Sequence, residues 1–510
     1  MVSRIGPLLH GQFAESGPVD DIERRISARS FARLLGGWRP SDGRRLAAAL
    51  TERIRLLVLD GRLSLQTRVP AERELAAALD VSRTTVAAAY DALRDAGFLH
   101  SRRGAGSWTR LPDTRPGAPA VAFSPFSPQG DDSLFDLAHA ALPAPTEEIR
   151  RAAAEALGDL DGYLSGHGYH LHGLPVLRAA IADRFTARGL PTTAEQILVT
   201  TGAQHAIALA LTALTGPGDR VLVEHPTYPN ALDAVHARGG RCVPVALGPD
   251  GTWDVDLFTA AVRDAAPRLA YLIPDFQNPT GALMDGTHRA GMVALARRTG
   301  TPLLIDETLA ELPLDGPAAK APPSPVAAHG GGESPLLLTV GSASKVFWGG
   351  LRIGWIRSSA AMIRRLAALR PAIDLGGAVL DQLVTARLIT TVESAAAARR
   401  GELAAARDHL LGRLGDLFPG WRPSRPAGGL SLWVDLGAPV SSRLAGSARR
   451  HGVLLAAGPR FGLDGAFERY LRLPFTLRPD RVEPALARLT AAWHGLDDTA
   501  PTDVEPVAVA

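Results

Sequence analysis

The sequence of 510 residues is short of three things: cysteine, lysine and long apolar runs. Its single cysteine, Cys242, excludes an internal disulfide framework and any metal site built on several cysteines. No run approaches the roughly 18 to 20 uninterrupted apolar residues that a membrane helix requires. Residues 1–12 carry no convincing signal peptide. We therefore expect a cytoplasmic protein without a metal centre.

Lysine is almost absent from this arginine-rich chain. There are two lysines, Lys320 and Lys345, against 53 arginines (55 basic residues minus 2). Arginine can replace lysine where only positive charge is needed, but a guanidinium does not form Schiff bases with aldehydes. Lys345 lies in Gly341-Ser342-Ala343-Ser344-Lys345, between an apolar run and a Gly-rich turn, which favours chemistry with the aldehyde of pyridoxal phosphate (PLP). A surface lysine without chemistry is the alternative, and it describes Lys320 well.

Length and charge indicate two unequal modules. A chain of 510 residues is too long for a single core. Residues 41–110 contain twelve arginines against eight acidic residues, a balance of +4, whereas the whole chain carries +3. The small module is therefore the part of the chain that is expected to bind a polyanion. The expected organisation is a leader of unknown role at 1–40, a basic module at 41–110, a linker at 111–133, a large module at 134–495 and a disordered tail at 496–510.

The basic module has the pattern of a winged helix-turn-helix. Apolar residues at helical spacing run from Gly43 to Leu59, and Pro70 opens a second helix. Ser82 is a natural N-cap for a third helix, which Gly97 closes. Two short strands follow around a basic, Gly-rich turn. A helix presented in this way inserts its N-terminus into the major groove of DNA, although a plain helical hairpin with a solvated basic face would show the same spacing.

A family resemblance adds weight to the DNA-binding interpretation. The segment Val69–Leu93, VPAERELAAALDVSRTTVAAAYDAL, resembles the GntR-type winged helix domain, and the match continues through Gly97-Phe98-Leu99 into a Gly-x-Gly wing. The resemblance implies a double-stranded DNA operator as partner. It implies DNA contacts from Arg73, Ser82, Arg83, Thr84, Thr85, Arg102, Arg103, Gly104 and Gly106.

The large module alternates apolar strand-like runs with helical patterns, which predicts an α/β fold with a mostly parallel sheet covered on both faces. Two later runs, at 430–436 and 470–473, indicate a smaller α+β unit. The strand-like runs of the main sheet lie at 197–199, 220–223, 269–273, 303–305, 336–340 and 353–356.

Polar residues at the ends of these runs could build a PLP site. Such a site needs an amine, an anion for the pyridinium nitrogen, a donor for the phenolate oxygen, a ring stacker and a phosphate cradle. Lys345, Asp306, Asn278 and Tyr228 are the candidates for the first four, in that order. The cradle is expected from Gly202, Ala203, Gln204, Ser342 and Arg352. Each has a bland explanation as a turn, a cap or a helix start, but their joint occurrence near strand ends favours a site.

From about residue 134 to 495 the chain resembles the fold-type I aminotransferases of class I/II. The resemblance implies that Lys345 is the Schiff-base lysine and Arg352 the phosphate arginine. It also implies that Arg472, in Leu471-Arg472-Leu473, pairs with the carboxylate of an amino acid. Tyr169 resembles a phosphate-contacting tyrosine given to the neighbouring subunit.

The sequence departs from this family after Asp306. The family has a tyrosine two or three residues later that bonds the phenolate oxygen, and here those positions hold Thr308 and Leu309. Thr308 would substitute only weakly for a phenol. We therefore expect cofactor capture but leave transaminase turnover open.

A GntR-type head joined to an aminotransferase-like domain resembles the MocR/GabR regulators. The resulting hypothesis is a PLP-dependent transcription regulator that senses PLP, an amino compound or both through an aldimine at Lys345. The resemblance implies a homodimer with a head-to-tail, domain-swapped arrangement. Two alternatives stay open: a working aminotransferase with a DNA-binding head, and a DNA-binding protein whose large domain is a cofactor-free relic.

Overall fold

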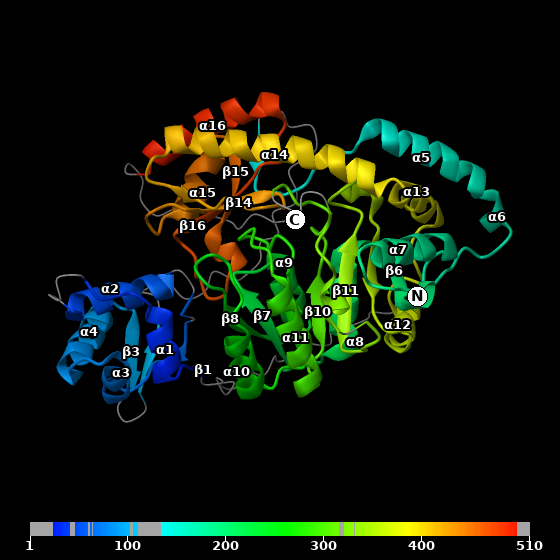
Figure 1. The fold of residues 1–510 in the computed structure, drawn as a ribbon. Coiled ribbons are helices and arrows are strands. Elements are labelled where there is room, and N and C mark those ends of the chain that lie inside the picture. Colours follow the sequence, from blue (N-terminus) through cyan, green and yellow to red (C-terminus); the bar gives the residue numbers. More distant parts are fainter. Residues whose placement is uncertain are drawn as a thin grey trace, which may run out of the picture. The chain divides into compact units, whose positions relative to one another are not determined.

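The chain forms two compact units, which are described separately (Figure 1). The computed structural model describes residues 24–40, 46–59, 62–63, 65–102, 106–110, 134–315, 321–330 and 332–496. The smaller unit contains the residues up to Arg53 and Gln66–Pro112, and the larger one contains Ile54–Leu65 and the chain from Asp113 on. The predicted linker, the wing tip at 103–105 and the predicted tail at 496–510, except for its first residue, Leu496, lie outside the described residues.

The smaller unit is the winged helix-turn-helix that the sequence predicts. Helices α3 (Glu72–Leu79) and α4 (Arg83–Asp95) flank a tight turn, and β3 (Leu99–Arg102) pairs antiparallel with β4 (Gly106–Thr109) to form the wing. Asp80 ends α3 with a φ of +52°, and the Ser82 hydroxyl caps α4 by accepting a hydrogen bond from the amide of Thr85 at 3.1 Å. Helix α2 (Leu46–Leu59) precedes this motif.

Residues 24–40, whose role the sequence leaves unassigned, fold with this unit. Strand β1 (Arg24–Arg25) pairs parallel with β2 (Thr67–Arg68), which extends the sheet to the order β1-β2-β4-β3. Helix α1 (Ala28–Leu35) contacts α3 and buries Phe31 completely. Arg39 donates hydrogen bonds to the carbonyl oxygens of Leu79 and Asp80, at the turn of the helix-turn-helix. Residues 24–40 therefore pack against the helix-turn-helix and stabilise it.

The larger unit is built on a seven-stranded sheet of order β6-β12-β11-β10-β9-β7-β8. Strand β12 runs antiparallel to both of its neighbours, and the other pairings are parallel, which confirms the predicted, mostly parallel sheet. The sequence did not predict β8. The strands are β6 (Ile197–Thr200), β7 (Arg220–His225), β8 (Arg241–Ala246), β9 (Leu269–Leu272), β10 (Leu303–Asp306), β11 (Leu337–Ser342) and β12 (Gly354–Arg357).

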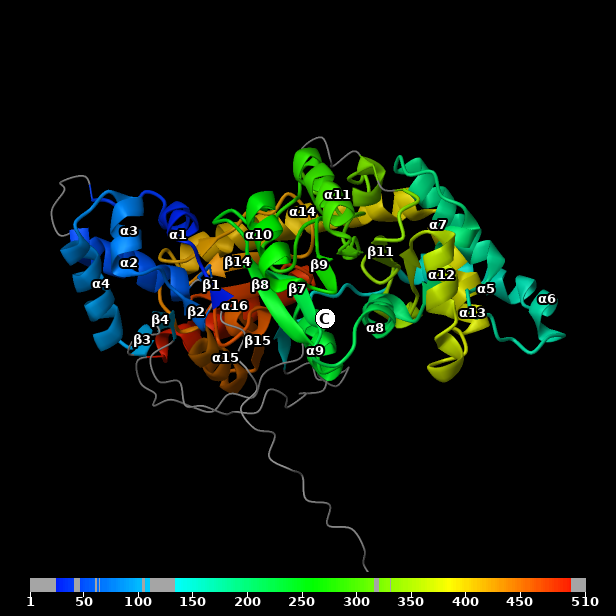
Figure 2. The ribbon, with the colours of Figure 1, turned by 90° about the horizontal axis from the view of Figure 1, so that it is seen from below.

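Helices cover both faces of this sheet because its strands are apolar on both sides. Leu222 points into a core shared with helices on one face, whereas Val221 and Val223 point into the core on the other. In Figure 2 the strands β7, β8 and β9 lie between α10 and α11 on one side and α8 and α9 on the other. The helices are α7 (Pro175–Ala187), α8 (Gly202–Leu214), α9 (Pro229–Ala237), α10 (Val255–Ala265), α11 (Gly286–Thr299), α12 (Ala360–Ala367) and α13 (Val379–Ile389).

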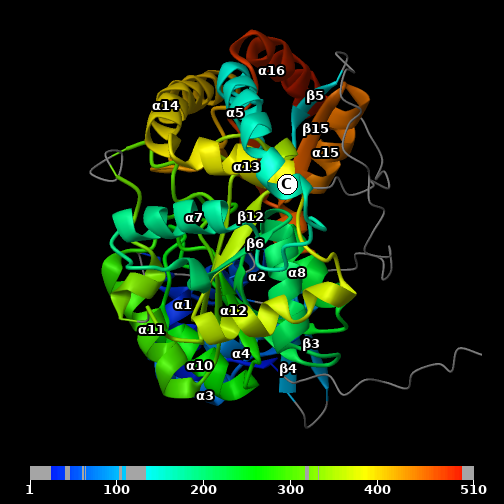
Figure 3. The ribbon, with the colours of Figure 1, turned by 90° about the vertical axis from the view of Figure 1, so that its right-hand side faces the viewer.

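A second, five-stranded sheet forms the smaller part of this unit. The sequence predicts this smaller part and two of its strands, at 430–436 and 470–473. Its order is β13-β14-β16-β15-β5, with β5 from the start of the unit added in parallel to β15. Helix α14 runs from α13 to this sheet, and α16 lies against α14 and α15 (Figure 3). The elements are β5 (Phe135–Leu137), α5 (Thr146–Asp159), α6 (Asp161–Leu164), α14 (Val392–Leu417), β13 (Arg422–Pro423), β14 (Ser431–Asp435), α15 (Ser441–Arg450), β15 (Val453–Ala457), β16 (Tyr470–Pro474) and α16 (Pro479–His494). None of the described helices is both long and apolar enough to cross a bilayer.

Candidate cofactor and DNA sites

Lys345 lies just after β11, on the short segment that joins this strand to β12. Its side chain is half-buried, and its Nζ donates a hydrogen bond to the carbonyl oxygen of Ala140 at 2.9 Å. Burial and the nearby charge of Arg472 lower the pKa of Lys345 to about 8, and Asp306 opposes this shift. The uncharged amine, which is the form that attacks an aldehyde, is therefore far more populated near neutral pH than it is for an ordinary lysine.

Asp306 is held at the C-terminal end of β10 by two neighbours. The phenol of Tyr271, on the adjacent strand β9, donates to Asp306 Oδ2 at 2.8 Å, and the Thr308 amide donates to Oδ1 at 3.0 Å. Burial raises the pKa of Asp306, while hydrogen bonds from Thr308 and Tyr271 and the charge of Lys345 lower it. These contacts fix the carboxylate at the sheet edge where ligands of open parallel sheets bind.

Arg472 is a fully buried guanidinium on β16 of the five-stranded sheet. It donates to the carbonyl oxygen of Ala138 and, at 3.1 Å, to Asn278 Oδ1, and it lies over the ring of Phe461. Its Nε has no hydrogen-bond partner in the part of the chain that the structure describes. Burial lowers the pKa of Arg472 to about 9, because the nearby acidic groups offset only part of the loss of water around the charge. The arrangement suits an incoming carboxylate.

Tyr228 and Asn278 follow β7 and β9, on segments that contain the cis peptide bonds His225–Pro226 and Asn278–Pro279. The Tyr228 hydroxyl accepts a hydrogen bond from the Asn230 amide at 2.9 Å. Burial and the charge of Asp306 raise the pKa of Tyr228 to about 12, whereas Arg472 and Arg352 lower it. Tyr228 is therefore within electrostatic reach of three of the predicted site residues.

The predicted phosphate cradle lies at the N-terminus of α8. Gly202 has a φ of +81°, and a Cβ there would lie 2.8 Å from Arg352 Nη2. Arg352 itself donates to the carbonyl oxygen of Thr201 at 3.0 Å, so its guanidinium is placed beside the amides of the first turn. Gly354 allows β12 to pass close by, since a Cβ there would meet the Gly202 carbonyl carbon at 2.5 Å. A dianionic phosphate fits this combination of amides, positive helix end and arginine.

A buried carboxylate that the sequence analysis missed ties the loops of the site together. Glu224, near the end of β7, is completely buried and accepts hydrogen bonds from Trp253 Nε1 at 2.6 Å, the amide of Ile273 at 3.1 Å and Gln277 Nε2 at 3.1 Å. Burial raises the pKa of Glu224 to about 8 against the effect of these donors. It thereby fixes the turns that carry Tyr228 and Asn278.

The structure thus brings Lys345, Asp306, Asn278, Tyr228 and Arg472 into one region. The cradle residues Gly202 and Arg352 lie close to this region, since the charge of Arg352 lowers the pKa of Tyr228. The arrangement fits PLP, because it supplies an amine of lowered pKa, a carboxylate at the sheet edge and an anion cradle closed by glycine. The remaining cradle candidates lie nearby: Gln204 donates to the Asn230 carbonyl at 3.0 Å, and the Ser342 hydroxyl donates to Ser344 Oγ at 2.9 Å.

Tyr169 is 60% exposed, and its ring stacks on that of His167. Thr308 is hydrogen-bonded to Asp306, and these bonds lower the pKa of the carboxyl. Tyr271, which the sequence analysis did not consider, supplies a phenol that bonds Asp306 directly.

The head presents a polar face at the start of α4. Arg73, Ser82, Arg83 and Thr84 are exposed and Thr85 is half-buried. The three hydroxyls form a cluster, with Ser82 Oγ 2.7 Å from Thr84 Oγ1 and 2.8 Å from Thr85 Oγ1, and Arg83 pairs with Glu72 at 3.2 Å. Gly106 begins β4 where a Cβ would lie 2.6 Å from Arg68 Nε. The side chain of Arg102, together with Arg103 and Gly104, lies outside the described residues.

Comparison with known proteins identifies both units. The family described as aminotransferase class I and II matches residues 134–489, and the family described as bacterial regulatory proteins, gntR family, matches residues 46–108. The uncharacterized HTH-type transcriptional regulator YisV of Bacillus subtilis is 27% identical over 477 residues, 87% of this chain and 95% of YisV. The probable rhizopine catabolism regulatory protein MocR of Rhizobium meliloti is 31% identical over 343 residues, 60% of this chain and 64% of MocR.

A solved structure supports the fold of the larger unit. LysN, the alpha-aminoadipate aminotransferase of Thermus thermophilus, superposes with a TM-score of 0.65 at 27% identity, over 72% of this chain and 94% of LysN. LysN was crystallised with N-(5'-phosphopyridoxyl)-L-leucine. The aminotransferase match alone covers more than half of the 510 residues. The chain therefore belongs to the aminotransferase class I and II family and, with its gntR-family head, is a member of the MocR/GabR type of regulator.

Proposed function

We propose that this protein is a DNA-binding transcription regulator whose larger unit holds PLP at Lys345 and senses an amino compound. The observation that carries the proposal is the convergence of a lysine amine of lowered pKa, the Asp306 carboxylate and the buried Arg472 guanidinium. The same chain carries a helix-turn-helix head with exposed arginine and hydroxyl groups at the start of α4. The larger unit, proposed as the sensor, and the head, proposed to bind DNA, are thus parts of one polypeptide.

Each residue of the larger unit has a proposed role. When bound, PLP supplies an aldehyde that condenses with amines and a ring that withdraws electrons. Lys345 would anchor the cofactor, Asp306 would keep the ring nitrogen protonated, and Asn278 would donate to the phenolate oxygen. Tyr228 would cover one face of the ring. The phosphate would be held by Gly202, Ala203, Gln204, Ser342 and Arg352, and Thr308 would act by orienting Asp306.

Arg472 is the proposed receptor for the effector's carboxylate, and its position suggests how the signal spreads. It lies on the five-stranded sheet but bonds Asn278, which follows a strand of the seven-stranded sheet. A carboxylate bound there would compete for these contacts and shift the population of arrangements of the two sheets. The linker, proposed at residues 111–133, would pass this change to the DNA-reading head.

A homodimer is part of the proposal. Large apolar side chains are exposed on α5, α6, α7 and the segments around α13, which is unusual for a monomer surface. Tyr169 belongs to this set and would reach a neighbouring subunit, as the resemblance implies. Two heads would then read two half-sites. The exposed residues are Leu157, Leu164, Tyr169, Val176, Ile373, Leu375 and Leu380.

A working aminotransferase is the second candidate, and it is favoured by the presence of Lys345, Asp306 and Arg472 together. The two functions separate in one experiment. Purified protein loaded with PLP is mixed with a panel of amino acids while cofactor absorption, keto-acid release and operator binding are followed. A regulator gives a stable spectral change that alters DNA affinity without continuous keto-acid release. Steady keto-acid production with unchanged DNA affinity would instead establish the enzyme.

A further inference from the structure

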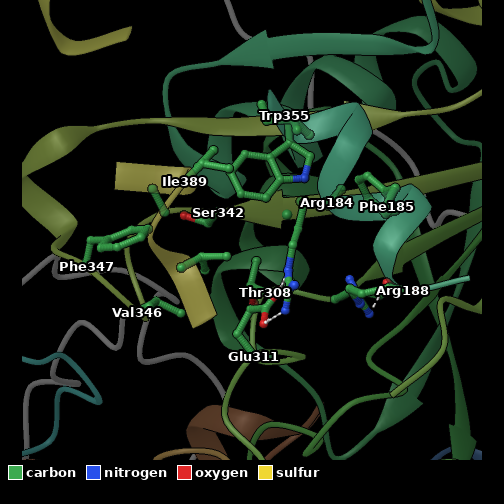
Figure 4. A pocket seen from close by; sticks show the side chains of 16 residues that line it. Arg184, Phe185, Arg188, Thr308, Glu311, Ser342, Val346, Phe347, Trp355 and Ile389 are labelled. Atoms are coloured by element: carbon green, nitrogen blue, oxygen red, sulfur yellow. Dashed lines mark hydrogen bonds and ion pairs between the residues drawn. The ribbon is translucent and has the colours of Figure 1, made fainter. Parts of the chain in front are cut away.

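A further pocket, the rear pocket, is lined by residues that directly follow Asp306 and by residues on either side of Lys345. It is lined by α7, by the turn after β10, by the end of β11 and by the junction between α13 and α14 (Figure 4). The centre of a water-sized molecule can move through about 40 Å³ inside it, and the total space between its walls, including open solvent at the mouth, is about 560 Å³. Lys345, Asp306, Tyr228, Asn278 and Arg472 do not line it, whereas Thr308 and Ser342 do, so it adjoins the proposed cofactor site without containing the amine.

The walls of this rear pocket are largely apolar. Phe185 of α7 and Phe347 line it together with aliphatic side chains, among them Val340, Ile389 and Val392. Trp355 stands at one end, and Thr308 and Glu311 lie at the other (Figure 4). Gly341 makes room for the indole, since a Cβ there would lie 2.3 Å from Trp355 Nε1. Such walls favour a compact apolar molecule.

The polar groups of the rear pocket limit the charge of its ligand. Arg184 donates to both carboxylate oxygens of Glu311, at 2.8 and 2.7 Å, and to the exposed Glu393 at 3.0 Å. Arg188 pairs with Glu307 at 3.0 Å. A ligand carboxylate would have to displace one of these acids, and a ligand cation would face two arginines. Both charged classes are therefore disfavoured.

One polar group in the wall is left over. Trp355 Nε1 is buried and has no hydrogen-bond partner among the residues that the structure describes. An indole N–H is a donor only, and a ligand acceptor would reach this one by displacing the atoms that cover it. A buried donor without a partner is unfavourable, and a single acceptor oxygen would remove that cost.

Two residues connect the rear pocket to the cofactor region. Thr308 lines the pocket and donates its amide to Asp306 Oδ1. Ser342 also lines it, and its hydroxyl bonds Ser344, the residue before Lys345. Packing on this wall therefore acts on the backbone that positions both the carboxylate and the amine.

We propose that the rear pocket binds a small, neutral, ring-sized apolar molecule with one hydrogen-bond acceptor, and that its binding changes the affinity of the Lys345 site for PLP. The binding step stands on the pocket alone, whereas the coupling step rests on the proposed function. By linkage, PLP changes the affinity for the pocket ligand by the same factor.

Tetrahydropyran is a suitable probe, because its ether oxygen accepts a hydrogen bond and cannot condense with an amine. Piperidine has a six-membered ring of the same size, with a protonated amine in place of the ether oxygen near neutral pH. It therefore serves as the negative control for a charged ligand. We expect tetrahydropyran to bind cofactor-free protein with a dissociation constant of about a millimolar or tighter, measured by ligand-observed NMR. Piperidine should show no binding in the same range.

Three variants locate the binding. Val392→Phe fills the pocket from α14 and should abolish tetrahydropyran binding. Trp355→Phe keeps an aromatic ring but removes the donor, and should weaken binding about 2- to 10-fold. Trp421→Phe removes another buried indole N–H without a described partner, outside the pocket lining, and should leave affinity unchanged. Thermal unfolding confirms that each variant is folded, and Trp355→Phe keeps the test valid if Val392→Phe does not fold.

The outcomes separate the two claims. The pocket proposal is overturned if the wild type and Val392→Phe bind tetrahydropyran equally. It is also overturned if the wild type shows no binding at a tetrahydropyran concentration ten times the expected dissociation constant. If tetrahydropyran binds but saturating amounts leave PLP affinity unchanged, the coupling is overturned. If the wild type takes up no PLP with or without the probe, the proposed function fails while the pocket result stands.

Discussion

The phenol of Tyr271 donates a hydrogen bond of 2.8 Å to Asp306 Oδ2 across the neighbouring strands β9 and β10. Both residues are buried, so the bond forms away from water, where a charge-assisted bond is worth most. Aminotransferases of this family usually have a tyrosine two or three residues after the aspartate. In this chain those two positions hold Thr308 and Leu309. Tyr271 supplies a phenol to the same region from another strand, but it binds the aspartate.

Replacing Tyr271 with phenylalanine tests this bond. The variant removes a donor that lowers the pKa of Asp306, so more of the carboxyl is protonated at neutral pH and less is available to the ring nitrogen. We expect PLP affinity to fall about 10-fold, in line with the loss of one hydrogen bond to a charged group. Tyr90→Phe is the control, since Tyr90 donates to the Pro70 carbonyl in the head. Equal PLP affinity in Tyr271→Phe and wild type would show that the bond plays no part in cofactor binding.

The pH dependence of PLP capture reports on Lys345. Its folded pKa of about 8 lies below the usual value for lysine, so the reactive neutral amine is gained as pH rises through about 8. The rate of PLP attachment, followed by absorption, should rise over that interval. Arg472→Gln removes a charge that lowers this pKa and should move the midpoint upward, whereas Arg469→Gln, whose guanidinium pairs with Asp435, should not. A midpoint near the usual lysine value of about 10 in the wild type would contradict the assignment.

DNA binding by the head is tested at Arg83. Arg83→Ala should weaken operator binding by about 10-fold or more, because an arginine at the start of α4 can reach bases and phosphates. Arg94→Ala removes an arginine from the other end of the same helix, where it pairs with Asp91, and should have a much smaller effect. Fluorescence anisotropy at two salt concentrations measures both. Identical losses for the two variants would mean that α4 does not present its N-terminus to DNA.

The N-terminal segment is expected to be necessary for a stable head. Phe31→Ala empties a fully buried site under α1 and should destabilise the head by about 3 to 5 kcal/mol. Hydrogen–deuterium exchange of peptides from α3 and α4 in the full chain should accelerate accordingly. Arg29→Ala, at an exposed position of α1, is the control. Unchanged exchange in Phe31→Ala would show that residues 24–40 do not support the motif.

The sequence predicted the elements that have a strong local signal. Near-continuous apolar runs marked six strands of the main sheet, and Ser82 marked the start of α4. Strand β8 was missed because Arg241–Ala246 is only partly buried and contains Pro244, which a central strand would not tolerate but an edge strand does. The short β5 was missed because its pairing partner β15 is distant in the sequence, with Phe135 paired to Val453.

The candidate site was predictable where a residue type is needed for its chemistry. Lys345, Asp306 and Arg472 could be chosen because few other residue types can supply a primary amine, an anion for the ring nitrogen or a guanidinium for a carboxylate. Tyr271 could not, because within β9 it has the pattern of an ordinary core residue, and its bond to Asp306 depends on the register of two strands. Glu224 likewise became visible only when three donors from separate segments met it.

The most direct measurement is mass spectrometry of the PLP-loaded protein after borohydride reduction and proteolysis. Lys320, the other lysine, is an internal control in every sample. The account predicts a stable phosphopyridoxyl adduct on Lys345 and none on Lys320, and it predicts loss of the adduct in Lys345→Arg. An unmodified Lys345, or equal labelling of the two lysines, would contradict it.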